Sequence, residues 1–319
     1  MAEITAARIN NLQSSIALIL GTGSGQNGYG QTVTSVPVNN TGDIVEAADI
    51  NAIYADILKA RVHQVGPGDI GIAQVIAGIP LALIPQPADT RANIVAENTS
   101  NYIDNRGITS IDPDGFKKGI LDFEALMTQV QADKSKMATS QSALEPGISS
   151  ARSSTWNGLI YHEVNVTFSS PDVRRFFFNT GGEIRISANN TGAVTPKGLD
   201  WKELCEQVGT IKFGANTTTA DSGGTSVGNY NITSAFQDIY RKDGSGTYSS
   251  IYAGNRYLVK VRSDIPTRII FRIEFNDLVT DNNVDNNVDG RLESVIQTYR
   301  ANGEVSVQAP SYYNSQSLA

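Results

Sequence analysis

The sequence predicts an α+β protein, in which an N-terminal helical and extended region precedes a mainly antiparallel β-sandwich domain. Two patterns favour this class. Before about residue 145, apolar residues return at helical spacing between stretches that are rich in Gly and Pro. After Trp156, alternating runs of β-branched and aromatic residues follow one another, and turn residues separate them.

The helical region is expected to begin with an amphipathic helix over 3–20, a range without Gly or Pro. The alternating, β-branched residues 31–38 predict a strand. A second helix is expected to open at the capping-box spacing of Asp43 and Glu46. Its apolar face ends where Gly66 and the proline after it stop the helix.

The middle of the chain is less regular. Repeated prolines across 66–113 predict an extended connector, with one short helical stretch near 89–101. A third helix is expected over 116–136, where apolar residues again gather on one side. Its apolar stripe is too short to predict a coiled coil.

The segment 146–155 has the Ser, Gly and Pro composition of a linker. We therefore expect an N-terminal region at 1–145 and a β-sandwich domain at 156–319. Within the second, a short helix is expected at 199–208, and the turn residues Asn179–Gly182 predict a hairpin. The expected strands are 160–168, 175–178, 183–187, 248–261, 267–275, 292–299 and 304–308.

Composition excludes several classes of function. The 319 residues carry 25 Lys and Arg against 32 Asp and Glu, a formal net charge of −7. Phosphate neutralisation needs grouped basic residues, so nucleic-acid binding is not expected. The apolar run Ile16–Leu20 is far shorter than a membrane span, so no membrane partner is expected. The N-terminus shows no secretory signal.

One glycine motif resembles a dinucleotide fingerprint. Gly23, Gly25 and Gly28 have the G-x-G-x-x-G spacing, and Asp43 stands near the distance of the ribose-binding acid. The fingerprint requires a helix to begin at the third glycine, so that its amides meet the pyrophosphate. A strand-like stretch with a proline follows here instead. We therefore expect no cofactor.

A second motif copies the opening of a calcium loop, Asp-x-Asn-x-Asp-Gly, at Asp285–Gly290. The twelfth position, which should supply a bidentate Glu, is Ile296. A polar turn between two strands is the simpler interpretation. The alternative is a structural calcium ion held by Asp281, Asp285 or Asp289.

No catalytic pattern stands out, so no enzymatic activity is expected. The single cysteine, Cys205, excludes an internal disulfide and a multi-thiolate metal site. His63 lies near a helix C-terminus, where a positive group is favoured, and His162 lies in a strand. The three rings of Phe176–Phe178 beside two arginines could stack on bases, but two of them lining a core is the stronger interpretation.

Similarity to a known protein family lies in Trp156–Ser187, Asn287–Ser294, Gly28–Gln31 and Asp56–Gln64. These segments resemble virion structural proteins of contractile-tailed phages, notably phages of cyanobacteria and other aquatic hosts. The most specific block is Arg-Arg-Phe-Phe-Phe-Asn-Thr-Gly-Gly within the first of them. Residues 66–145 have no counterpart. The resemblance implies a particle component without enzymatic activity.

From this resemblance we expect a structural component of the tail, baseplate or neck, assembled in the host cytoplasm and present in the virion. The chain is expected to form homo-oligomers and to bind other virion structural proteins. The N-terminal region would then be an assembly arm whose apolar helix faces dock on partners. The residues expected to make these contacts are Ile4, Leu12, Ile16, Ile53, Ile57, Phe123 and Val130.

Two alternatives remain open at this level. Exposed aromatic residues could bind host surface polysaccharide, which would make the chain a glycan-binding module of a fibre or appendage. The candidates are Tyr248, Tyr252, Tyr312, Tyr313 and the loop 279–289. The other alternative is a hydrolase of sugar polymers, which needs two facing carboxylates that the sequence alone does not place.

Overall fold

The computed structural model describes residues 6–38, 45–68, 120–244, 246–279 and 287–318. It has the predicted α+β class, with helices first and a mainly antiparallel β region after them. The chain divides into two compact units. A helical unit holds Met1–Gln141 together with Asn302–Ser306, and a β unit holds Ser142–Ala301 and Val307–Ala319.

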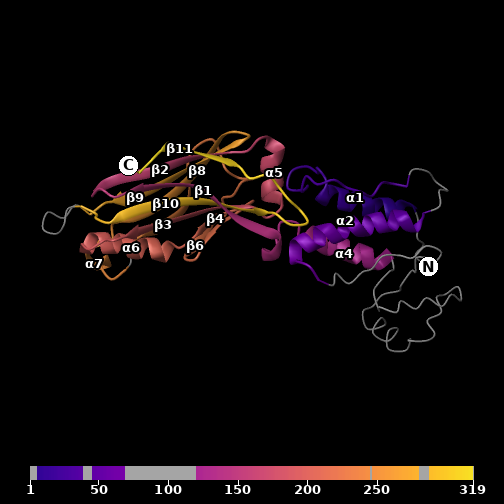
Figure 1. The fold of residues 1–319 in the computed structure, drawn as a ribbon, viewed down its shortest axis with the longest axis horizontal. Coiled ribbons are helices and arrows are strands. Elements are labelled where there is room, and N and C mark those ends of the chain that lie inside the picture. Colours follow the sequence, from indigo (N-terminus) through magenta and orange to yellow (C-terminus); the bar gives the residue numbers. More distant parts are fainter. Residues whose placement is uncertain (1–5, 39–44, 69–119, 245, 280–286, 319) are drawn as a thin grey trace, which may run out of the picture. The chain divides into compact units, whose positions relative to one another are not determined.

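Three helices that contact one another form the helical unit (Figure 1). They are α1 (Ala6–Leu20), α2 (Ala47–Val65) and α4 (Ile120–Ala132), and a 3₁₀ turn, η1 (Thr139–Gln141), follows. Helix α2 starts later than predicted. Its N-cap is Glu46, and the capping box joins Glu46 to Asp49, whereas the predicted box joined Asp43 to Glu46. The helical stretch predicted at 89–101 lies outside the described residues.

Residues 31–38 are extended, but they do not form the predicted strand. Side chains on the neighbouring helices bind this segment in place of a partner strand. The Asn10 amide donates to the Val38 carbonyl (3.0 Å) and accepts from the Val38 amide (2.8 Å). The Asp56 carboxylate accepts from the amides of Thr34 and Ser35. β-Branched alternation therefore produced an extended chain without a sheet.

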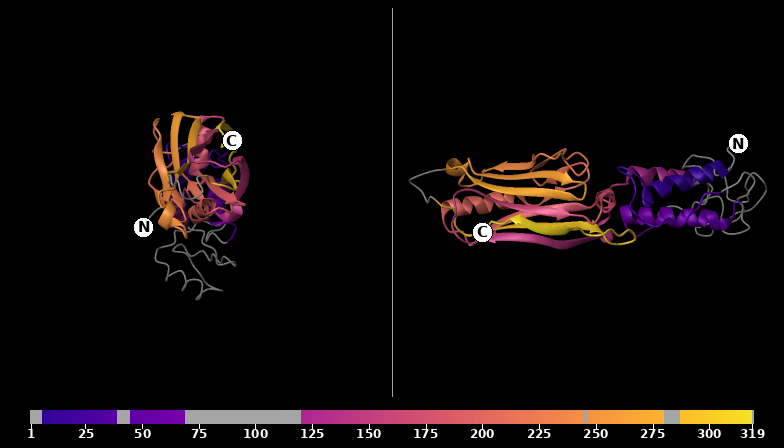
Figure 2. Two further views of the ribbon diagram at one scale, coloured as in Figure 1. Left: turned by 90° about the vertical axis from the view of Figure 1, so that its left-hand side faces the viewer. Right: turned by 90° about the horizontal axis from the view of Figure 1, so that it is seen from above.

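The β unit is a sandwich-like pair of antiparallel sheets (Figures 1 and 2), ordered β1-β10-β3-β4-β5-β6 and β11-β2-β9-β8-β7. The strands are β1 (Ser142–Arg152), β2 (Gly158–Thr167), β3 (Glu183–Thr191), β4 (Ile211–Phe213), β5 (Thr218–Ala220), β6 (Gly223–Thr225), β7 (Gln237–Asp243), β8 (Arg256–Ile265), β9 (Arg268–Asp277), β10 (Arg291–Ala301) and β11 (Ser311–Gln316). The helices are α5 (Pro171–Asn179), α6 (Pro196–Val208) and α7 (Ser249–Tyr252).

Alternating inward side chains form the core between the sheets. On β2, Val164 and Val166 are buried, as the predicted alternation requires. Phe213 of one sheet and Phe271 of the other meet edge to face, with ring centroids 5.2 Å apart. Helix α6 packs on β3, and its Trp201 ring contacts Phe275 on β9.

Several boundaries in the β unit differ from the prediction. The segment predicted as a linker, 146–155, is largely strand β1, because β10 pairs with it along its length. The strand predicted at 304–308 is absent; residues 302–306 belong to the helical unit, and β11 follows them. The strand predicted at 248–261 is split, since α7 occupies its beginning and β8 starts only at Arg256.

The predicted strand at 175–178 is helix α5. Ser170 is its N-cap, and the Ser170 hydroxyl accepts a hydrogen bond from the Val173 amide (3.1 Å). Pro171 occupies the first turn, where its missing amide hydrogen costs nothing. The cap and the proline outweigh the β-propensity of three consecutive Phe residues.

Candidate functional site

Helix α2 carries two apolar stripes. The first, Ile50, Ile53 and Ile57, is buried in the core of the helical unit. The second, Tyr54, Leu58 and Val62, recurs every fourth residue and is only half-buried. This second stripe lines a groove of about 300 Å³.

The opposite wall of the groove is the extended segment that contains Thr32 and Thr34. Asp56 fastens this wall to α2. Its carboxylate accepts from the Thr34 hydroxyl (2.8 Å), the Thr34 amide (3.0 and 3.1 Å) and the Ser35 amide (2.8 Å). Asp56 is 2 % exposed, so its carboxylate depends on these donors in place of water, although Thr34 itself is exposed.

One edge of the groove comes from the far end of the sequence. Residues 302–306 return to the helical unit, where the Gln141 side chain accepts from the Glu304 amide (2.8 Å). Gln31 donates to the Ser306 carbonyl (2.9 Å). Gly303 allows residues 302–306 to approach Gln141 closely, because a Cβ at Gly303 would lie 2.1 Å from the Gln141 side-chain oxygen.

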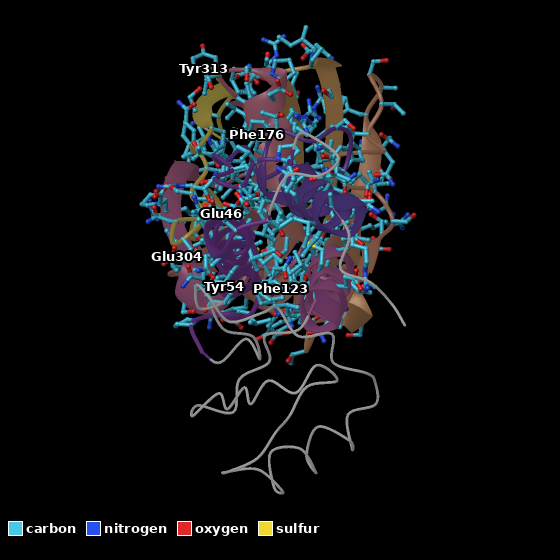
Figure 3. All side chains as sticks on the ribbon, turned by 90° about the vertical axis from the view of Figure 1, so that its right-hand side faces the viewer. Glu46, Tyr54, Phe123, Phe176, Glu304 and Tyr313 are labelled. Atoms are coloured by element: carbon cyan, nitrogen blue, oxygen red, sulfur yellow. The ribbon has the colours of Figure 1, made fainter. Side chains whose placement is uncertain are left out.

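The groove has an apolar floor and two opposite charges. Lys59 and Glu304 both line it, and neither has an ion-pair partner among the residues that the structure describes. The Tyr54 ring meets the buried Phe123 ring edge to face at 6.5 Å, which holds Tyr54 in place. Tyr54, Phe123 and Glu304 are labelled in Figure 3. Such a groove fits an apolar side chain flanked by charges of opposite sign.

Most residues predicted as partner contacts lie inside the helical unit. Their side chains are between 0 % and 4 % exposed and pack against one another, so they are internal core. They are Leu12, Ile16, Ile53, Ile57, Phe123 and Val130. Ile4 lies outside the described residues. The sequence could have indicated the second stripe, because apolar residues on α2 cover more of its circumference than one core face needs.

The glycine motif at 23–28 forms a turn after α1. Gly23, Gly25 and Gly28 all have positive φ, and a Cβ at Gly28 would lie 2.2 Å from the Thr22 carbonyl oxygen. No helix begins at Gly28. The glycines therefore have a backbone reason to be present at this turn.

Asp289 binds the residues that lead into helix α6, including its N-cap, Thr195. Its carboxylate accepts from the Thr195 hydroxyl (2.6 Å) and from the amides of Val194 (2.9 Å) and Thr195 (3.2 Å). Burial opposes ionisation of Asp289, but these hydrogen bonds outweigh it and lower the pKa of the carboxyl group. The other two calcium candidates, Asp281 and Asp285, lie outside the described residues. Within the described ranges, no three His, Cys, Asp or Glu side chains are placed to hold a metal ion.

His162 lies in an arrangement that resembles a catalytic triad. Its Nδ1 is 3.1 Å from the Ser294 hydroxyl, and its Nε2 is 2.8 Å from the Asn314 Oδ1. Because Asn314 Oδ1 only accepts, Nε2 carries the proton and Nδ1 accepts from Ser294. His162 and Ser294 are both 0 % exposed, so no substrate reaches the hydroxyl. The trio joins β2 and β11 of one sheet to β10 of the other.

The Phe-rich block behaves as core. Phe177 and Phe178 are fully buried, while Phe176 is half-buried under the Arg175 guanidinium at 4.7 Å. Arg174 is buried and donates to Asn229 (2.7 Å) and to neighbouring hydroxyl and carbonyl oxygens. Burial lowers the pKa of Arg174 to about 10. This arrangement leaves no open ring for stacking on a base.

The tyrosines proposed for glycan binding are mostly inaccessible. Tyr252 is 1 % exposed, and the Tyr312 hydroxyl contacts Thr298 between the sheets at 2.5 Å. Tyr248 is half-buried, and Tyr313 alone of the four is open, at 68 % exposure. Among the described residues, no helix combines the length and apolar character that a membrane span requires.

Comparison with known proteins adds no relative. No protein-family model matches the chain, and neither a curated protein nor a solved structure matches it.

Proposed function

We propose that this chain is a non-enzymatic structural component of a tailed-phage particle, in the tail, baseplate or neck, and that it acts through contacts with neighbouring proteins. The groove on α2 carries this proposal, because it is an apolar surface that the described residues of the helical unit leave half-covered. The resemblance of Trp156–Ser187 to virion proteins supplies the kind of particle.

The occupant that fits the groove is an apolar side chain of a neighbouring particle protein. A volume of about 300 Å³ lies at the lower limit of ligand pockets, so it holds one or two side chains. Lys59 and Glu304 would each pair with an opposite charge beside that anchor, which sets its orientation. Repeated copies in a particle would add such small contacts together.

A variant pair tests this assignment. Leu58→Lys places a charge on the groove floor, whereas Leu18→Lys alters a 40 % exposed leucine on α1 that does not line the groove. Particles assembled with each variant would be purified, and the chain in them quantified. We expect at least tenfold less of Leu58→Lys, with Leu18→Lys unchanged and both variants equally stable.

Imaging of the same particles at side-chain resolution provides the second test. A neighbouring side chain seated between Tyr54 and Leu58 would support the proposal. Absence of the chain from purified particles, or an empty groove in every copy, would refute it. The glycan-binding alternative now depends on Tyr313, which is 68 % exposed.

A further inference from the structure

Buried polar side chains gather at one end of the β unit, where α6 meets α7 and β9. The Lys197 ammonium lies 2.6 Å from the Asp277 carboxylate, and their side chains are 3 % and 1 % exposed. Lys197 also donates to the Val279 carbonyl (3.0 Å). Asp200, on the same helix and 1 % exposed, accepts from the Asn255 amide nitrogen at 3.1 Å.

At the contact between Asp200 and Asn255, one oxygen atom of each side chain lacks a hydrogen-bond donor. Asp200 Oδ1 and Asn255 Oδ1 are both buried, and neither has a hydrogen-bond partner among the described residues. A buried acceptor without a donor destabilises a fold by about 1–3 kcal/mol. Asp200 and Asn255 are already joined by one bond from the amide to the carboxyl group. A proton on Asp200 Oδ1 would give the Asn255 oxygen the donor it lacks, as in a carboxylic acid paired with an amide.

The charges around the cluster favour that proton. Lys197 supplies one positive charge, whereas Asp277 on β9 and Glu203 on α6 repel a second negative charge at Asp200. Burial is the largest cause, and together these effects raise the pKa of Asp200 to about 6. Two buried tyrosine hydroxyls, on Tyr252 in α7 and Tyr257 in β8, belong to the elements packed here.

We propose that Asp200 takes up a proton in the folded chain and then donates to Asn255 Oδ1, forming a two-bond latch between α6 and the α7–β8 connection that ionisation opens. When the proton leaves Asp200 Oδ1 for solvent, Asp200 becomes a second negative charge near Asp277, whose carboxylate already pairs with Lys197. The latch lies within the β unit and does not depend on the proposed particle contacts.

Tryptophan fluorescence reads this site directly. The chain has two tryptophans, and Trp156 and Trp201 lie together here, with ring centroids 5.2 Å apart. A pH titration of the full-length protein should change their emission with a midpoint near the pKa of Asp200, while circular dichroism remains native. Asp200→Asn should abolish that transition, whereas Glu206→Gln, at an exposed carboxylate on α6, should retain it.

Stability gives a second readout with an unusual sign. The folded pKa of Asp200, about 6, lies above its ordinary value of 3.8. The protonated group therefore stabilises the fold fully below pH 3.8, and this stabilisation is lost as pH rises through 6. Between pH 4 and pH 8, the folding equilibrium of the unmodified chain should weaken about 60-fold through this group. Asp200→Asn should escape this loss and be the more stable protein at pH 8.

Three results would overturn the latch. One is a flat fluorescence titration of the unmodified chain, which needs no variant to interpret. Another is an Asp200→Asn protein that is less stable than the original at pH 8. The third is saturable stabilisation of the unmodified chain at pH 8 by millimolar calcium chloride, lost in Asp200→Asn, since a cation would then neutralise the carboxylates.

Discussion

Asp56→Ala should unfold the helical unit under conditions in which the β unit stays folded. The Asp56 carboxylate receives hydrogen bonds from three donors, namely the Thr34 amide, the Thr34 hydroxyl and the Ser35 amide. These bonds hold residues 31–38 against α2, and no partner strand among the described residues would replace them. The substitution therefore removes the attachment of the groove wall.

The expected loss follows from the number and kind of these bonds. Hydrogen bonds to a charged group contribute about 1.5–3 kcal/mol each, and unmade buried donors cost a similar amount. Thr34 is exposed, so water compensates part of the loss at this residue. We expect the free energy of unfolding of the helical unit to fall by about 3–5 kcal/mol.

Hydrogen exchange during urea titration resolves the two units separately. Amides of α1 and α2 should lose protection at lower urea in Asp56→Ala, and amides of β9 should not. Asp172→Asn is the matched control, because its carboxylate is exposed and pairs with Arg175 on the surface; it should change stability by less than about 1 kcal/mol. A loss below 1 kcal/mol in Asp56→Ala would refute the attachment argument.

Three further predictions concern neighbouring features. Arg174→Ala should lower the free energy of unfolding of the β unit by about 3–5 kcal/mol in a denaturant titration, because it leaves buried acceptors without donors. Arg175→Ala, at a surface ion pair, should lower it by less than about 1 kcal/mol in the same titration. Burial lowers the pKa of His162 below its ordinary 6.5, so stability should fall as pH drops below 6.5, where the unfolded chain takes up the proton first. Thermal unfolding of His162→Gln should lack this pH dependence. If the variant keeps the same loss of stability in acid, the prediction is wrong. Gly28→Ala should lower the melting temperature of the helical unit, since its φ is 96° and its Cβ would meet the Thr22 carbonyl; equal melting temperatures would show that the turn tolerates a side chain.

Much of the β unit was predictable, because a half-buried strand carries its own signal. On β2, buried Val164 and Val166 alternate with the more exposed Glu163 and Asn165, and on β9 buried Phe271 and Ile273 flank the more exposed Arg272. This alternation indicates both the strand and its buried face. Helix α6 was also expected, although its start at Pro196 and its cap at Thr195 were not. The signals for these strands and for α6 lie within ten to fifteen consecutive residues, so they can be recognised without knowing which distant segment each element packs against.

The elements that were missed depend on distant partners. Strand β1 has linker composition and becomes a strand because β10, almost 150 residues later, pairs with it. Residues 31–38 have strand composition but contact Asn10 and Asp56 in place of a sheet. Intrinsic β-propensity is about 1 kcal/mol or less per residue, so such partners decide the outcome.

The sequence by itself determined the α+β class, the apolar helix faces and the absence of a recognisable catalytic motif, because these follow from local periodicity and spacing. Tertiary structure decided which apolar face is core and which lines the groove, since both stripes of α2 are apolar. It also decided that His162 and Ser294 meet out of reach of solvent, and that Asp200 faces Asn255. Burial and distance set the chemistry of these groups, and both depend on residues far apart in the chain.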